Sequence, residues 1–468
     1  MQQPRIRIRL SEALRLSDLQ LTLIWAGIVG FAGASTSVLF RKAALFVQQL
    51  LWRHEGELVR AADGIPWWQR LLIPALGGLA AGWVIGFGAR IAKGEPSTDF
   101  MEAVSLRDGS IPVKPSLIKS FSSLLSVASG GSIGREGAMA QLASMLASWF
   151  GRLRGLPLPR QRLLVACGAA AGIASAYNAP LAGALFVAEI VLGSIAMESL
   201  GPLVFSSVVA TITTRQLLGQ GPLFDIPQFH LVSVFELVPY LILGVALGAL
   251  APAFVRLLRA TQRLFVLWLP SVPARLCAGG AIVGVLSLVQ PQVWGNGNAS
   301  IGAILGAQWA WHAIGMVLVF KLVATLATVG SGAVGGVFTP TLFVGAAFGA
   351  LFGGLVHAVI PGWSAEASAY ALVGMGAFLA GTTHAPLTAI LALFEMTLDY
   401  GIVLPLMFAC VVAYYTARAI DTRSIYSDSL ARKAPAEAFD DARGSTIRAL
   451  VRPGPITVRE NASFAELV

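Results

Sequence analysis

The feature that most constrains this chain is a succession of apolar segments, several of them shorter than a membrane span and interrupted by glycine. A helix needs about 20 apolar residues to cross a bilayer. Hydrophobic residues make up 56% of the 468 residues and charged residues only 12%, whereas soluble domains carry about 25% charged residues. We therefore predict an all-α polytopic membrane protein.

The short, glycine-broken segments favour particular classes of membrane protein. Broken or re-entrant helices are tolerated at membrane depth only where they are buried in protein or line a watery cavity. This requirement favours a transporter or channel over a simple membrane anchor. Some of the 50 glycines also serve close helix packing, which is common in membrane bundles.

The charge distribution argues for membrane orientation and against nucleic-acid binding. The net charge is +9, and the basic excess lies in the first residues and again after residue 422. The positive-inside rule predicts that both termini are cytoplasmic. Nucleic acid is not an expected partner, because the basic residues flank apolar spans and form no stripe with aromatics. The histidines and cysteines lack metal-ligand spacing, so we expect no metal and no other cofactor.

The stretch Ser129–Ala143 places a glycine-rich turn and a lone Arg135-Glu136 pair between two apolar segments. An ionisable side chain at membrane depth costs roughly 2.5 to 3.5 kcal/mol and often marks an ion path. The glycines let backbone N–H groups approach a ligand, and the following apolar helix directs its positive dipole end at the turn. An ordinary helix start, with Glu136 as a dipole partner and Arg135 at an aqueous boundary, is the alternative.

A second breaker-rich turn, residues 94–99, precedes a predicted helix from Phe100 to Leu106. Its hydroxyl and N–H groups could line an ion site. Equally, Ser97 or Thr98 could cap the helix, and composition alone favours the cap.

Two motifs recur in the same order along the chain. Residues Asn178–Glu189 are similar to His384–Glu395 at an offset of 206, from Pro180 to Pro386. The glycine-rich Gly330–Pro340 is the partner of Ser129–Ala143 at a similar offset. Two halves with broken helices, about 20–220 and 230–420, indicate a structural repeat of the kind that places an ion site near the bilayer midplane.

Together these residues resemble the CLC family of chloride channels and chloride/proton antiporters, from about Leu79 to Arg432. Gly134-Arg135-Glu136-Gly137 is similar to its GREGP motif, and Gly336-Val337-Phe338-Thr339-Pro340 to its GxFxP motif. Asn178–Glu189 is similar to its NAPLAGxLFxxE stretch. The resemblance implies about 18 helices of mixed length and tilt, in two inverted-topology repeats whose broken helices meet at the midplane. It also implies a homodimer with one pathway per subunit, in a bacterial inner membrane.

The resemblance implies a role for individual residues. Glu136 is the gating glutamate, whose carboxylate competes with chloride and moves away when protonated. The N–H groups of Val337 and Phe338 help to form the anion site, and the Tyr426 hydroxyl closes it from the inside. Helix ends and hydroxyls suit such a site, because a full positive charge would hold the ion too tightly.

Three departures from the family pattern bear on these roles. The family's GSGIP motif is replaced by residues 94–98, where ungapped spacing places Glu95 at the serine ligand and leaves Ser97 as the candidate. Ala138 replaces the proline after GREG, which we expect to be mild. Ile190 stands where the antiporters often carry a second, proton-relaying glutamate.

Glu189, the neighbour of Ile190, has two interpretations. It could take over the proton relay, or it could serve as a structural helix-end carboxylate, as its repeat partner Glu395 suggests. The structural role is favoured because both residues fall where repeat-related helices meet a membrane boundary.

The predicted organisation has three parts: a cytoplasmic segment at 1–18, the transport domain at 19–432 and a cytoplasmic tail at 433–468. The tail turns polar, and from Ile456 onward it weakly resembles the opening of a CBS domain.

The predicted function is transmembrane chloride transport, with chloride/proton exchange gated by Glu136 ahead of a passive chloride channel. Chloride, protons and the lipid bilayer are the expected partners. A membrane-embedded enzyme is a remote alternative, because Gly130–Gly134 matches GxSxG with Ser132 as its serine. That motif needs an α/β sheet, which this apolar chain does not suggest.

Overall fold

The computed structural model describes residues 18–53, 58–92, 97–219, 221, 223–224, 229, 233–361 and 365–431. Residues 1–17 of the predicted N-terminal segment, the predicted tail at 433–468 and Glu95 lie outside the described residues.

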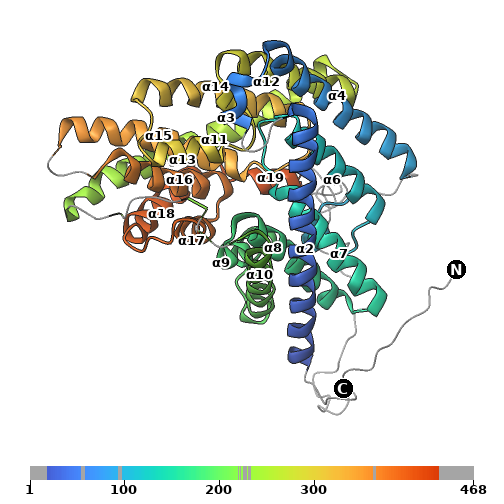
Figure 1. The fold of residues 1–468 in the computed structure, drawn as a ribbon. Coiled ribbons are helices and arrows are strands. Elements are labelled where there is room, and N and C mark those ends of the chain that lie inside the picture. The colour runs from blue at the N-terminus through green and yellow to red at the C-terminus, as the bar shows by residue number, and fades with distance from the viewer. Residues whose placement is uncertain are drawn as a thin grey trace, which may run out of the picture.

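The described chain is a bundle of helices of very different lengths (Figure 1). In Figure 1, α2, α6 and α7 lie on one side, α15, α16 and α18 lie on the other, and α19 is near the centre of the view. The α-helices are α2 (Asp18–Trp52), α3 (Leu58–Ala61), α4 (Trp67–Ile91), α5 (Phe100–Ser105), α6 (Val113–Ala128), α7 (Glu136–Arg154), α8 (Leu158–Tyr177), α9 (Pro180–Phe186), α10 (Met197–Leu218), α11 (Leu237–Trp268), α12 (Val272–Val289), α13 (Asn298–Leu305), α14 (Trp311–Gly330), α15 (Phe338–Val359), α16 (Ala367–Thr383), α17 (Pro386–Thr397), α18 (Val403–Ile420) and α19 (Ile425–Ala431).

Seven of the described helices are long and apolar enough to cross a membrane: α2, α4, α11, α12, α14, α15 and α18. Other apolar helices are too short to span alone, among them α16 and α17. These lengths agree with the broken segments of the sequence. The prediction of an all-helical, multi-pass membrane protein is confirmed.

The short helix α16 and its counterpart α8 lie in the interior of the bundle. Every residue of α16 from Ala369 to Thr383 is buried, and most of α8 from Leu164 to Tyr177 is buried too. Burial in protein satisfies the condition under which short segments persist at membrane depth. α8 packs against α7 and α16 packs against α15, the two helices that begin at the glycine-rich turns.

The internal repeat is visible in the backbone at the ends of α8 and α16. Asn178 and His384 each terminate their helix in the left-handed conformation, with φ of 58° in both. Proline then begins the next helix, at Pro180 in α9 and at Pro386 in α17. Asparagine tolerates the left-handed conformation well and histidine is also enriched there. The sequence echo therefore corresponds to the same helix–break–helix unit in both halves.

The predicted hydroxyl cap of α5 is wrong. The helix begins at Phe100 and ends at Ser105, and its N-terminus has no side-chain cap from the residue before it. Instead, the Phe100 N–H donates to Gln141 Oε1 at 2.9 Å. The Gln141 amide also donates to the Thr98 carbonyl oxygen at 3.1 Å and to Ser116 Oγ at 3.0 Å. A side chain from α7 thus supplies the cap that local composition assigned to Ser97 or Thr98.

Candidate functional site

The two glycine-rich turns meet directly at the centre of the fold. The Gly134 N–H donates to the Gly336 carbonyl oxygen, and the Gly336 N–H donates to the Gly134 carbonyl oxygen, each at 2.8 Å. This pairing brings the N-terminus of α7 next to that of α15. Both helix ends carry partial positive charge and exposed N–H donors, so together they favour an anion between them.

Glu136 is the buried first residue of α7, and its carboxylate lies at the start of α15. Its Oε1 accepts a hydrogen bond from the Thr339 N–H at 3.3 Å. A side chain of one half therefore places its negative charge on the helix end of the other half. An anion bound at the same N–H groups would have to displace this carboxylate.

The glycines of the two motifs make room for that carboxylate. A Cβ on Gly134 would overlap both carboxylate oxygens of Glu136, and one on Gly336 would lie 2.5 Å from its Cδ. Because real side chains do not pack this closely, glycine is required on both sides of Glu136. The two glycines therefore permit both the tight turns and the observed position of the Glu136 carboxylate.

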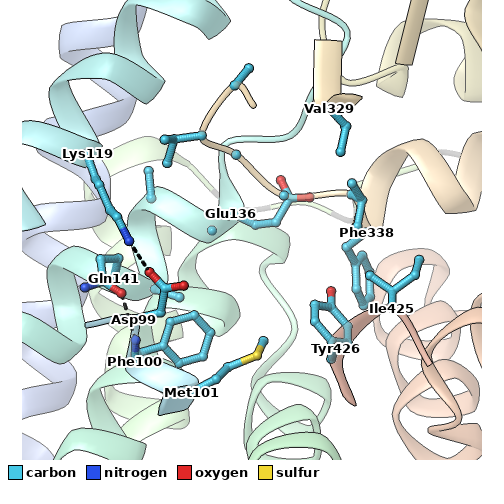
Figure 2. A pocket seen from close by; sticks show the side chains of 18 of the residues that line it. Asp99, Phe100, Met101, Lys119, Glu136, Gln141, Val329, Phe338, Ile425 and Tyr426 are labelled. Atoms are coloured by element: carbon cyan, nitrogen blue, oxygen red, sulfur yellow. Dashed lines mark hydrogen bonds and ion pairs between the residues drawn. The ribbon is translucent and has the colours of Figure 1, made fainter. Parts of the chain in front are cut away.

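A cavity of about 520 Å³ opens beside Glu136. Figure 2 shows Glu136, Phe338 and Tyr426 around this cavity. The ring of Phe186 connects the other two aromatic side chains, with centroids 6.2 Å from Phe338 and 5.3 Å from Tyr426. The cavity is lined by six of the residues predicted from the motifs: Glu136, Gly137, Gly336, Val337, Phe338 and Tyr426.

Pro340, also predicted from the motif, is buried in the first turn of α15 and does not line the cavity. Arg135 lines a different, smaller cavity together with Arg41. Adjacent residues of the motif therefore contribute to two separate cavities, with Glu136 at the larger one.

Sequence reasoning missed a charged pair on the cavity wall. Lys119 Nζ lies 2.6 Å from Asp99 Oδ1, and both side chains are partly accessible (Figure 2). Such a pair is well placed beside water and costly next to lipid. The available signal was that Asp99 is the last residue of the breaker-rich turn at 94–99.

Ser97 does not line the cavity. It is exposed, and its carbonyl oxygen accepts from Lys119 Nζ at 3.4 Å. Lys119 also pairs with Asp99, two residues after Ser97, and both Lys119 and Asp99 line the cavity.

Tyr177, the last residue of α8, is a second lining residue that sequence reasoning missed. Its ring centroid lies 4.7 Å from that of Phe338, and its hydroxyl shares a hydrogen bond with Thr339 Oγ1 at 3.2 Å. Thr339 also supplies the N–H that binds Glu136. Tyr177 therefore fixes the side chain of the residue whose backbone holds the acid. Its place directly before the Asn178-Ala179-Pro180 motif was the available signal.

Glu189 and Glu395 form reciprocal helix caps between the two halves. Glu189 caps the N-terminus of α17, and Glu395 caps the N-terminus of α9. Glu189 accepts from the N–H groups of Leu387 at 3.3 Å and Thr388 at 2.8 Å, at the start of α17. Glu395 accepts from the N–H groups of Leu181 at 2.9 Å and Ala182 at 2.8 Å, at the start of α9. A carboxylate at a helix N-terminus satisfies otherwise unpaired donors. This reciprocal arrangement favours the structural interpretation of Glu189.

Neither Glu189 nor its neighbour lies on the cavity beside Glu136. Glu189 belongs to a π-helical turn, Val187–Val191, and its oxygens are engaged by α17. Ile190 packs as a partly buried apolar side chain against the core. The second carboxylate of the family pattern therefore has no counterpart at its usual position here.

Replacing Glu189 by glutamine tests the two interpretations. The neutral amide keeps one acceptor and loses the charge at the α17 N-terminus, so stability should fall by about 1 kcal/mol. If Glu189 is structural, the chloride-driven proton movement predicted from the sequence should persist. Thermal unfolding and liposome flux measure the two quantities, and Glu395→Gln should lower stability similarly. Lost proton movement with unchanged stability would assign Glu189 to the relay instead.

The fold and the site define a class: a multi-pass membrane transporter or channel whose buried acid sits at paired helix N-termini. Residues 77–418 match the family model described as "Voltage gated chloride channel". The chain belongs to this family.

The relatives agree over nearly their full lengths. A ClcB-like chloride channel protein of Ralstonia nicotianae is 49% identical over 411 residues, which cover 87% of this chain and 96% of the relative. The voltage-gated ClC-type chloride channel ClcB of Citrobacter koseri is 43% identical over 408 residues, or 86% and 97% of the two chains.

Solved structures show the same fold. A slow cyanobacterial Cl⁻/H⁺ antiporter matches with a TM-score of 0.79 and 28% identity, covering 89% of this chain and 98% of its own. A CLC-type fluoride/proton antiporter matches with a TM-score of 0.72 at 21% identity, covering 88% of this chain and 98% of its own, which supports the fold alone.

The enzyme alternative is wrong, because the family consists of channels and transporters. The serine of the GxSxG match is explained by packing. Ser132 is buried, and its Oγ shares a hydrogen bond with Thr325 Oγ1 at 3.0 Å. The described residues contain no sheet on which a nucleophile turn could be built, only the isolated bridge between Gly134 and Gly336.

Proposed function

We propose that this protein exchanges chloride for protons across the membrane, with Glu136 as the gating glutamate. Its family membership makes transmembrane chloride transport the function at the coarser level. The observation that carries the proposal is the hydrogen bond from the Thr339 N–H to the Glu136 carboxylate. The acid occupies a donor at the N-terminus of α15, next to the Val337 and Phe338 N–H groups that we propose for the anion.

The proposed cycle begins with the ionised carboxylate at the N-terminus of α15. Protonation removes its negative charge, so its attraction to the two helix ends falls. The side chain then leaves, and chloride enters the space and accepts hydrogen bonds from the N–H groups of Val337 and Phe338. When the carboxyl group loses its proton to the other side of the membrane, the carboxylate returns and displaces chloride.

Weak ligands suit this cycle. Conduction requires that the anion bind well enough to enter and loosely enough to leave. Backbone N–H groups and the hydroxyl of Tyr426 offer partial charges. The nearest full charge of the motif, on Arg135, faces the other cavity.

Proton access to Glu136 is proposed to run through the large cavity. Its volume of about 520 Å³ far exceeds the share of liquid volume of one water molecule, about 30 Å³. Its wall includes Asp99, Lys119 and the Tyr426 side chain, which can hydrogen-bond water. A water path of this kind requires no carboxylate at Ile190. The likeness to an antiporter at 28% identity supports exchange over passive conduction.

A homodimer with one pathway per subunit is part of the proposal. Glu136, Phe338 and Tyr426 of one chain all line the same cavity, so one subunit supplies the proposed site residues. The half-exposed caps at Glu189 and Glu395 lie beside the outward-facing Leu181 and Leu387. Carboxylates are costly against lipid, so a second copy covering this face would stabilise the arrangement. Both termini are proposed to be cytoplasmic.

Purified protein in liposomes tests the exchange. A chloride gradient should drive protons against their own gradient when charge is balanced by a potassium ionophore. A pH electrode and a chloride electrode record both fluxes together. Chloride flux without proton movement would establish the rival function, a passive chloride channel.

A further inference from the structure

A second cavity, of about 320 Å³, contains the side chain of Arg135, the residue next to the gating acid. Arg41 of α2 lines it too. None of the described residues that line this cavity is acidic. Two guanidinium groups without an acid on the described wall create a region that attracts anions.

One wall of this cavity is the start of α13. The helix begins at Asn298 after Gly297, which has no side chain to cap it, although the Asn298 N–H donates to Asn296 Oδ1 at 3.3 Å. The first-turn residues Asn298, Ala299 and Ser300 all line the cavity. A helix N-terminus adds partial positive charge and N–H donors to the two arginines.

Two buried donors on the same wall have no hydrogen-bond partner among the described residues. They are Ser300 Oγ and Trp294 Nε1, and each residue is only 2% exposed. Buried polar groups in folded proteins are almost always hydrogen-bonded, so an unpaired donor calls for a ligand. A hydroxyl and an indole N–H can both donate to an anion.

The loop that carries Trp294 is held from behind by Lys321. Its Nζ donates to the carbonyl oxygens of Val293 at 3.0 Å, Trp294 at 2.9 Å and Gly295 at 2.7 Å. The loop carbonyls are thereby engaged by the lysine. The backbone N–H groups of Val293 and Trp294 donate to the carbonyl oxygens of Gln290 and Pro291, so the Trp294 indole N–H is the loop donor that the cavity site uses.

We propose that this cavity is a second anion-binding site, which takes a small inorganic anion such as chloride. Its ligands are the Ser300 hydroxyl, the Trp294 indole N–H and the α13 N-terminus, and the guanidinium groups of Arg41 and Arg135 supply attraction. The site binds anions independently of exchange. Its role as a reservoir for the pathway at Glu136 rests on the proposed function.

Crystals of the full chain grown in bromide test the site by anomalous diffraction. The structure predicts one bromide peak beside Ser300 and Trp294, and a separate one at the N–H groups of Val337 and Phe338 in Glu136→Gln protein. No peak beside Ser300 at saturating bromide would overturn the second site and leave the exchange proposal standing. A peak there with none at Val337 would do the reverse.

Ser300→Ala supplies the matched measurement in solution. Removing one hydrogen bond to a charged ligand should weaken bromide binding at this site about ten-fold in a calorimetric titration. Ser37→Ala is the control, since Ser37 Oγ is also buried without a partner in the described part of the chain but does not line this cavity. An equal effect of the two substitutions, or none from Ser300→Ala, would contradict the assignment.

Discussion

Glu136→Gln protein is expected to transport chloride and to lose chloride-driven proton movement completely. Glutamine has nearly the shape of glutamate, but it carries no negative charge and cannot release a proton. The Thr339 N–H, which now donates to Glu136 Oε1 at 3.3 Å, would lose a charged acceptor and become available to chloride. The liposome assay with paired electrodes measures both fluxes in the same sample.

Glu102→Gln is the matched control for this prediction. Glu102 is also a buried glutamate, but it pairs with Arg107 at 2.7 Å and does not line the cavity beside Glu136. Proton movement should survive in this variant. If Glu136→Gln protein still moved protons in fixed proportion to chloride, Glu136 would have no part in coupling.

Lys321→Met is expected to lower the stability of the protein more than Glu189→Gln does. Lys321 lies on the membrane-spanning helix α14 and is only 1% exposed. Its three hydrogen bonds to residues 293–295 use all three donors of the ammonium group. Methionine fills similar space and leaves three carbonyl groups without this donor.

The expected cost is on the order of 2 to 4 kcal/mol. Each buried group left unpaired costs about 1 to 3 kcal/mol, and removal of a buried charge offsets part of the sum. The midpoint of thermal unfolding in detergent, followed by loss of the monodisperse chromatographic peak, measures the effect. Lys42→Met makes the same chemical change at an exposed position and should leave the midpoint nearly unchanged.

An unaltered unfolding midpoint in Lys321→Met protein would contradict this account of the lysine. It would mean that the loop at 293–295 is held by its other packing, such as the contact of Trp294 with Trp52 at 4.9 Å between ring centroids. The second anion site would then lack the support that Lys321 gives its wall.

The helical fold and the repeat could be predicted from the sequence because both depend on local patterns. The apolar runs and their glycine breaks predicted short interior helices, and the echo of Asn178–Glu189 in His384–Glu395 located the matching breaks. The mutual pairing of Gly134 with Gly336 was beyond local reasoning, since it depends on how the two halves approach each other.

The wrong prediction for the α5 cap has the same cause. Ser97 and Thr98 looked like caps of α5, but Gln141 from α7 caps that helix. A contact between residues 41 positions apart in the chain leaves no mark in a short window of sequence. For Glu189 the repeat partner suggested a structural role, and only the structure shows that the two caps are exchanged between halves.

Lys321 is a different case, because the sequence did contain its signal. A single lysine within an apolar span is unusual and marks a buried partner or a functional site. The partners themselves, the backbone carbonyls of residues 293–295, carry no side-chain signature. Their recognition required the folded chain.

The measurement that tests the central claim most directly is the reversal potential of the current through purified protein in a planar bilayer. Chloride is kept equal on both sides while a pH difference is imposed. Obligatory exchange of chloride for protons predicts a reversal potential that departs from zero and changes sign when the pH difference is reversed. A reversal potential that stays at zero under both conditions would contradict proton coupling and leave a passive chloride pathway.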